Sequence, residues 1–394
     1  FCTALILNTI TAGNMFQAWN VANLTQSYFG VPTVVTGFIL AILVGAVIIG
    51  GIKRIGAVTS KLVPFMLILY VLACIFVLSV NLSQIPIMLA LIVTSAFEPL
   101  EASNAFIGGT AGYAFMYGMQ RALFSNEAGQ GSSAIAHSAA KTDEPIREGV
   151  VAGLEPFIDT IVVCTMSALV ILVTGIWNRP AEMNLDQATF TQDSENIWAL
   201  ETSGSSMDTL QNGQRVFFVY EGNLNPQTGN KQQKVYGTVL QTNGVNTISW
   251  SPVESNIEPV INNNGLYLDY VGATLTAAAF DKVLPGLGKW LVTLASWLFA
   301  ISTMISWSYY GEKGVVYLMG EKGIFLYKIM FCVLVVLSTT GFIQTDAELN
   351  MFANLGTGFC IIANLPIIWL FGYQAMSSYK EYIQKLKAGE FTRS

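Results

Sequence analysis

Charge is the scarcest property of this sequence. Of its 394 residues only 11% are charged, against 53% that are hydrophobic, and residues 1–52 contain no charged side chain. Because a soluble globular domain carries about 25% charged residues, this composition predicts a polytopic, all-α membrane protein. No basic patch interrupts the chain, which argues against nucleic acid as a partner and leaves membrane lipid as the predicted surroundings.

Reactive side chains are also few. The five cysteines all lie in apolar spans without metal-ligand spacing, and His137 is the only histidine. This pattern favours cysteines that are buried as small hydrophobic residues, and it offers no paired nucleophile and base. We therefore predict that the protein is not an enzyme and needs no cofactor. We expect His137 to be structural, with pH sensing as the alternative.

Long apolar stretches predict eight membrane crossings. These are 1–29, 33–52, 63–80, 108–140, 150–177, 290–310, 324–343 and 349–373. Each is long enough to cross a bilayer as a helix. Segments 86–107 and 270–288 contain proline, and we expect them to lie in the membrane interface or to re-enter the membrane.

Residues 178–269 differ in composition from the rest of the chain. They are polar, rich in Asn, Gln and Gly, and contain alternating runs such as Arg215–Tyr220 and Lys234–Leu240. Alternation with a period of two is typical of strands, so these two runs predict a β-hairpin with a long turn. We therefore predict a strand-bearing, extracellular insertion, whose protein partner is unknown.

The distribution of Lys and Arg predicts the orientation. With eight crossings, segments 53–61, 141–147 and 311–328 lie on the same face as the tail, and together they hold 12 of the 19 basic residues. The positive-inside rule then places both ends in the cytoplasm and the insertion outside. The expected location is the plasma or inner membrane of the cell.

A polar break, S-N-E-A-G-Q-G at Ser125–Gly131, interrupts the apolar span 108–140. Unpaired backbone groups in hydrocarbon are costly, so irregular backbone at that depth survives only where it is buried in protein or lines a wet cavity. We interpret the break as a binding site, with Asn126, Gly129 and Gly131 as candidate substrate contacts. A simple glycine hinge is the alternative.

Glu127, within the break, is an acid near mid-bilayer. A charge at that depth costs at least about 2.5 kcal/mol unless it has a partner. Glu127 could respond to ion occupancy or take a proton. The alternative is a structural ion pair with Arg121, which only the break would bring within reach.

Polar side chains also recur at every third position of the first span. They are Asn8, Thr11, Asn14, Gln17, Asn20, Asn23 and Gln26. A step of three residues drifts slowly around a helix, so these side chains form a stripe that must face protein or water. Both interhelical hydrogen bonding and contact with a substrate fit this stripe.

The run Arg121–Ala140, R-A-L-F-S-N-E-A-G-Q-G-S-S-A-I-A-H-S-A-A, resembles the sodium:alanine/glycine symporters. So do G-G-I-K-R-I, K-L-V-P-F-M and W-S-Y-Y-G-E-K, which occur in family order. The resemblance covers nearly the whole chain outside 178–269. It implies a LeuT-type fold with inverted repeats and broken helices, in which 1–177 holds helices three to seven, including the broken helix 108–140. Residues 270–376 would then hold helices eight to ten, and 377–394 would be a cytoplasmic tail.

The resemblance also implies which residues contact the substrate. Asn14 and Gln17 match the N-x-x-Q of the family's third helix, where side-chain amides contact substrate. Trp307 would form a wall of the pocket, and ordinary core packing is its alternative.

Ion binding and coupling are implied at further positions. Ser302, Thr303 and Ser306 could supply oxygen ligands for sodium, and hydrogen bonding to the preceding turn is the alternative. Asp159 could belong to a gating network with Glu127 and Arg121, or could simply form a hydrogen bond between helices. We expect no metal beyond sodium, and no organic cofactor.

These implications predict sodium-coupled symport of alanine or glycine by alternating access, with a proton as the alternative coupling ion. The family's G-T-G-N motif and its second helix have no counterpart in this sequence. We therefore expect either a piece of a longer transporter or a member that does not transport. The alternative function is a membrane sensor or binding protein that uses its extracellular insertion.

Overall fold

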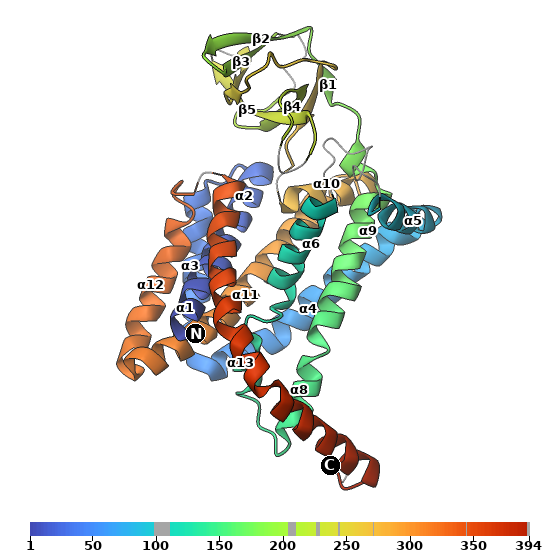
Figure 1. Cartoon of the computed structure of the whole chain (residues 1–394). Coiled ribbons are helices and arrows are strands. Elements are labelled where there is room, and N and C mark those ends of the chain that lie inside the picture. Colours follow the sequence, from blue (N-terminus) through green and yellow to red (C-terminus); the bar gives the residue numbers. More distant parts are fainter. Residues whose placement is uncertain are drawn as a thin grey trace. The chain divides into compact units, whose positions relative to one another are not determined.

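The structure is a computed structural model of the chain (Figure 1), and it describes residues 1–97, 111–203, 210–225, 229–242, 245–270, 272–343 and 345–391. The chain divides into two compact units. The first comprises Phe1–Phe76, Met119–Ser167 and Lys289–Ser394, and the second comprises Val77–Gly118 and Ala168–Gly288.

Helices build the first unit. Its elements are α1 (Cys2–Ile10), the π-helix η1 (Thr11–Met15), α2 (Phe16–Phe29), α3 (Thr33–Ile48), most of α4 (Gly51–Val80), the second half of α6 (Ala111–Asn126), α7 (Ser133–His137), α8 (Pro145–Ala152), the π-helix η3 (Phe157–Cys164), the start of α9 (Thr165–Val173), α11 (Gly288–Met319), the short η6 (Glu321–Gly323), α12 (Ile324–Leu337) and α13 (Asp346–Ala388). A capping box starts α13: the Thr345 side chain accepts a hydrogen bond from the Glu348 backbone N–H, and the Glu348 carboxylate accepts one from the Thr345 N–H.

Within the described residues, four helical stretches are long and apolar enough to cross a membrane: Gly51–Val80, Pro145–Val173, Gly288–Met319 and Glu348–Ala388. The predicted start of the span 63–80 and the predicted end of the span 290–310 are wrong. Lys53 and Lys61 lie inside α4, and Lys313 lies inside α11, not in loops. Lys is a good helix former, so a charged side chain at the end of an apolar run does not end the helix. For the same reason α13 continues through much of the predicted tail.

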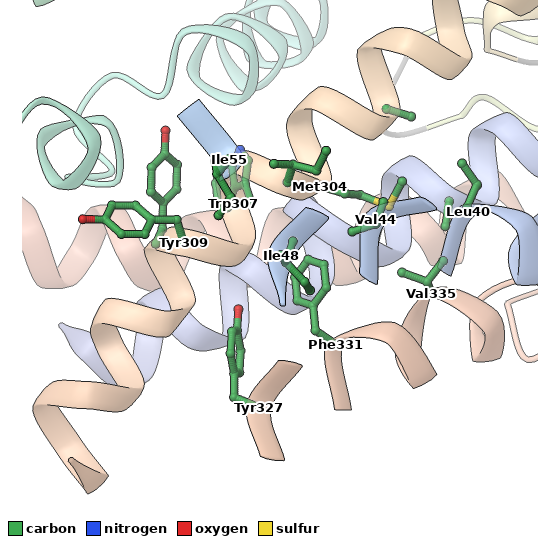
Figure 2. Packing of buried hydrophobic residues seen from close by; sticks show 14 of the residues in the cluster. Leu40, Val44, Ile48, Ile55, Met304, Trp307, Tyr309, Tyr327, Phe331 and Val335 are labelled. Carbon is green, nitrogen blue, oxygen red and sulfur yellow. The ribbon is translucent and has the colours of Figure 1, made fainter. Parts of the chain in front are cut away.

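Small residues let the helices of the first unit pack closely. Figure 2 shows Leu40, Val44 and Ile48 of α3 in one buried cluster with Phe331 and Val335 of α12. Gly37 of α3 lies directly against Thr339, and Gly356 of α13 lies against Thr11 and Asn8. Close approach at small residues is typical of helices that pack in membranes. The inverted repeat of a LeuT-type fold stays a prediction.

The second unit holds every strand of the described chain, together with α5 (Ile85–Ser95), α10 (Ala273–Val283) and the short helices η2 (Leu82–Gln84) and η4 (Ile176–Asn178). The strands are β1 (Met183–Asn184), β2 (Gln187–Ser194), β3 (Ile197–Ser203), β4 (Arg215–Glu221), β5 (Gln232–Thr242), β6 (Val245–Trp250), β7 (Val253–Glu254) and β8 (Gly265–Leu268). They form two antiparallel sheets, in the orders β1-β8-β4-β5-β6 and β2-β3-β7.

The prediction of a strand-bearing insertion is confirmed. The predicted hairpin is β4 paired with β5, from Arg215 opposite Thr238 to Glu221 opposite Gln232. Val216, Phe218 and Tyr220 alternate along β4 and point into one hydrophobic core, as a period of two requires. Of the predicted interfacial segment 86–107, residues 86–95 lie in α5, and 98–107 lie outside the described residues.

Candidate functional site

The break in the helix is the centre of the candidate site. α6 ends at Asn126 and α7 begins at Ser133, so the helix is interrupted where the sequence predicts. Within the interruption the φ angles are 54° at Glu127 and 78° at both Gly129 and Gly131. Left-handed backbone of this kind favours glycine. The Asn126 side chain accepts a hydrogen bond from the Ala128 N–H at 2.9 Å, which turns the chain out of the helix.

Buried amides from distant helices hold the break. Asn8 of α1 donates from Nδ2 to Gln130 Oε1 at 2.9 Å, and its own oxygen accepts from Thr357 Oγ1 of α13 at 3.2 Å. Gln130 also donates to the Leu123 carbonyl at 2.6 Å. Asn8 is 0% exposed and Gln130 is 1% exposed, so this network is sealed from solvent. Such a network specifies one arrangement of the break.

Asn364 of α13 contacts the two glycines of the break. Its Nδ2 donates to the Gly129 carbonyl at 3.0 Å, and a Cβ at Gly131 would lie 2.8 Å from Asn364 Cγ. Asn364, Gln130 and Thr357 were not predicted as functional residues. Two of them had a signal in the sequence: Gln130 lies within the polar break, and Asn364 is an amide inside an apolar helix, which is expensive unless it has a partner.

Glu127 is held within its own segment. Its carboxylate accepts from Ser132 Oγ at 2.6 Å and lies near the Trp307 indole. The alternative of an ion pair with Arg121 does not hold, since Arg121 Nη2 donates instead to Asn350 Oδ1 at 2.8 Å. The left-handed turn at Glu127 brings its carboxylate to Ser132, while Arg121 stays on the regular part of α6.

The end of α6 is bonded to the π-helix η3. Ser125 Oγ donates to Asp159 Oδ2 at 2.5 Å, and Asn126 Nδ2 donates to Thr160 Oγ1 at 3.2 Å. Asp159 therefore accepts a hydrogen bond between helices, which was the alternative to a gating role. The gating role itself stays a prediction. π-Helical turns occur frequently at functional sites.

We expect the contributions of Ser125 and Asp159 to the free energy of unfolding to be strongly coupled, because the two side chains share a hydrogen bond. A hydrogen bond to a charged acceptor contributes about 1.5 to 3 kcal/mol, so Asp159→Asn and Ser125→Ala should each lower the melting temperature of the purified protein. In a double-mutant cycle, the combined variant should lose less stability than the sum of the single losses. Thermal unfolding of the four proteins checks this, and simple additivity would show that the bond contributes nothing.

The second π-helix, η1, lies against Trp307. A Cβ at Gly13 would lie 2.5 Å from Trp307 Cγ, so the backbone of η1 touches the indole ring, which is 6% exposed. The next residue, Asn14, is 0% exposed and donates from Nδ2 to the Phe331 carbonyl at 2.8 Å. Its side-chain oxygen has no donor within the described residues. Gln17 of α2 donates to the Ala12 carbonyl of the preceding π-helix η1 at 3.3 Å.

The predicted sodium ligands lie on α11. Ser302 Oγ donates to the Phe299 carbonyl at 2.8 Å. This is the hydrogen bond to the preceding turn that was the alternative to sodium binding. Ser302 Oγ also lies 3.6 Å from Met66 Sδ. Thr303 and Ser306 are half-buried, and neither hydroxyl forms a hydrogen bond in the part of the chain that the structure describes. No group of three metal-ligating His, Cys, Asp or Glu side chains occurs among the described residues.

His137, at the end of α7, lies between two carboxylates. Its Nδ1 lies 2.7 Å from Glu148 Oε1 of α8, and its Nε2 lies 3.7 Å from Glu155 Oε2. This arrangement links the segment after the break to α8, which agrees with the structural role expected for His137.

Comparison with known proteins shows a match across most of the chain. The sequence model of the sodium:alanine symporter family matches residues 1–201 and 259–394. The sodium/alanine symporter AgcS of Methanococcus maripaludis is 35% identical over 319 residues, which is 81% of this chain and 51% of AgcS.

Two Bacillus proteins are similar over nearly the whole chain. The putative sodium/proton-dependent alanine carrier protein YrbD of Bacillus subtilis is 28% identical over 95% of this chain and 61% of its own length. The sodium/proton-dependent alanine carrier protein of Bacillus sp. PS3 is 28% identical over 99% of this chain and 71% of its own length. The chain thus spans about half to seven-tenths of these relatives, and the family is one of transporters, not enzymes.

Proposed function

Because the chain belongs to the sodium:alanine symporter family, we propose that it takes part in sodium-coupled symport of alanine or glycine by alternating access at the broken helix. The observation that carries this proposal is the backbone of the break. The N–H groups of Gly129 and Gly131 make no hydrogen bond within the described residues. Backbone donors in a left-handed turn suit an anion, here the carboxylate of the amino acid.

The remaining parts of the substrate site follow from the same geometry. The buried, unpaired oxygen of Asn14 offers an acceptor for the substrate ammonium. Trp307 lies against Gly13 and near Glu127, and its bulk would limit the substrate side chain to that of a small amino acid. We assign Asn126, Gly129 and Gly131 to the same site, and Gln17 to its edge. The assignment to small substrates is supported by the chain's similarity to proteins named as alanine symporters and carriers.

We propose Ser302, Thr303 and Ser306 as sodium ligands. Ser302 and Ser306 are four residues apart on α11, so their hydroxyls lie on one face of that helix. A hydroxyl that donates its proton to a carbonyl, as Ser302 does to Phe299, still presents its oxygen lone pairs to a cation. Sodium, a hard cation, favours oxygen ligands.

Coupling is assigned to the charged groups around the break. Glu127 is bonded inside the break, Asp159 is bonded to the end of α6, and Arg121 ties α6 to α13 through Asn350. A change in the break on ion or substrate binding would therefore alter all three contacts. The protein is an integral membrane protein, and we propose that its two ends lie in the cytoplasm.

Uptake into proteoliposomes tests the proposal directly. The complete gene product that carries residues 1–394 should take up radiolabelled alanine or glycine when an inward sodium gradient is imposed. A membrane potential supplies about 2.3 kcal/mol per charge per 100 mV, enough for roughly fiftyfold accumulation with one sodium ion. In a second experiment, an inward proton gradient replaces the sodium gradient and tests the proton as the coupling ion. Folded protein that takes up neither amino acid under either gradient would contradict the proposal.

A further inference from the structure

The strand-bearing insertion contains a cavity of its own. It has a volume of about 220 Å³ and is lined by Tyr220, Glu221, Gln232, Asn262, Asn263 and Tyr267, with Val219 at its wall. Four of these seven residues fall in 202–258, the part of the chain that the family comparison leaves unmatched. The cavity is therefore a feature of this chain that family membership does not explain.

Rigid elements form the walls of the cavity. Glu221, at the end of β4, exchanges two backbone hydrogen bonds with Val260 at 2.8 Å. The Tyr267 ring on β8 is stacked on Phe217, with ring centres 5.2 Å apart and planes 13° apart. Tyr220 is buried and packs edge-on against Phe190. Walls held in this way need little reordering when a ligand binds.

Polar groups of the cavity are available for a ligand. Within the described residues, the Glu221 carboxylate and the Gln232 and Asn262 side-chain amides form no hydrogen bond or ion pair. The amides can both donate and accept, and the carboxylate accepts at two oxygens. Burial raises the pKa of Tyr220 and Tyr267 above 10.0, so both hydroxyls stay neutral.

The lining also limits the class of ligand. None of the seven lining residues is Lys, Arg or His, while one is an acid, so phosphorylated and other anionic ligands are disfavoured. The volume lies below the range of about 300 to 1,000 Å³ that drug-sized ligands occupy, which limits the ligand to about one ring.

We propose that this cavity binds a neutral saccharide unit. Adjacent sugar hydroxyls both donate and accept, as do the amides of Gln232 and Asn262, and the Glu221 carboxylate can accept from two neighbouring hydroxyls. Tyr267, which is half-buried, offers a flat apolar ring surface to the C–H face of a sugar ring. A neutral sugar also fits a lining that disfavours anionic ligands. This inference does not depend on transport, since it concerns residues outside the broken-helix site.

Ligand-observed NMR on the complete protein in nanodiscs tests this inference. The probes are glucose and N-acetylglucosamine, with glucose 6-phosphate as the anionic control and agmatine as the cationic control. We expect at least one neutral sugar to bind with a dissociation constant of about 1 mM or below, and glucose 6-phosphate to bind at least about tenfold more weakly.

Substitutions then locate the binding. Glu221→Gln, which keeps the shape of the side chain, should weaken sugar binding about tenfold, and Asn262→Ala should also weaken it. The matched control is Glu195→Gln, an exposed acid in the turn between β2 and β3, which should bind as the unaltered protein does. Three results would overturn the inference: no sugar binds, Glu221→Gln binds the sugar unchanged, or agmatine binds in preference to the sugars.

Discussion

Replacing Gly131 with alanine is expected to lower sodium-dependent uptake more than tenfold. Gly131 has a φ of 78°, where an L side chain adds about 1 to 2 kcal/mol of strain. The new Cβ would also lie 2.8 Å from Asn364 Cγ and Oδ1, and overpacking of this kind typically costs about 1 to 3 kcal/mol. Both costs fall on the conformation of the break that the proposed transport needs. Initial rates of uptake into proteoliposomes, beside the melting temperature, measure the effect.

Gly129 provides the matched control. It has the same φ of 78°, but a Cβ there would meet only Leu365 Cδ2, at 3.9 Å. Gly129→Ala should therefore carry the strain without the clash and should keep more activity than Gly131→Ala. Adding Asn364→Ala to Gly131→Ala should recover part of the loss, because it removes the atoms that clash. If the two glycine variants were equally impaired, the contact with Asn364 would not matter to the break.

Local features of the fold could be predicted from the sequence. The break follows from residues that are neighbours in the chain: the glycines adopt the left-handed turns, and Asn126 caps the first of them. The β4–β5 hairpin follows from alternation along two short runs. In each case the physical cause lies within about a dozen residues, so the pattern is visible before any tertiary contact is known.

The contacts that hold the site could not be predicted in this way. Asn8 is 122 residues from its partner Gln130, and Asn364 is 235 residues from Gly129. The polar stripe of the first span indicates that Asn8 faces protein or water, but not which partner it meets. The alternative of an Arg121–Glu127 ion pair does not hold because nearness in the chain does not decide the partner, and Arg121 donates to Asn350 on α13.

Helix lengths also depended on information outside the local pattern. The hydropathy of α4 falls near Lys53 and Lys61, yet the helix extends from Gly51 to Val80 with Pro64 inside it. A backbone that continues as a helix satisfies its own hydrogen bonds, and long cationic side chains can reach toward water from a helix end. Composition therefore located the apolar spans better than it located the ends of the helices.

Replacing Gly13 with alanine is expected to impair uptake about as strongly as Gly131→Ala, although Gly13 lies on a different helix. A Cβ at Gly13 would lie 2.5 to 2.6 Å from three atoms of Trp307. Trp307 packs in the buried cluster of Figure 2 and cannot move aside freely, so the π-helix or the indole must shift. Gly358→Ala on α13 is the control, because nothing lies within 4 Å of a Cβ there.

The kinetics of Gly13→Ala can tell whether η1 and the break act as one site. Trp307 contacts the backbone at Gly13 and lies near Glu127, so its displacement should raise the KM for alanine as well as lower the maximal rate. Residues that share a partner are not additive, so Gly13→Ala combined with Gly131→Ala should lose less activity than the product of the two single losses. If the losses were fully multiplicative and the KM unchanged, Trp307 and the break would act independently. The unpaired backbone of Gly129 and Gly131 would then be the main contact for substrate.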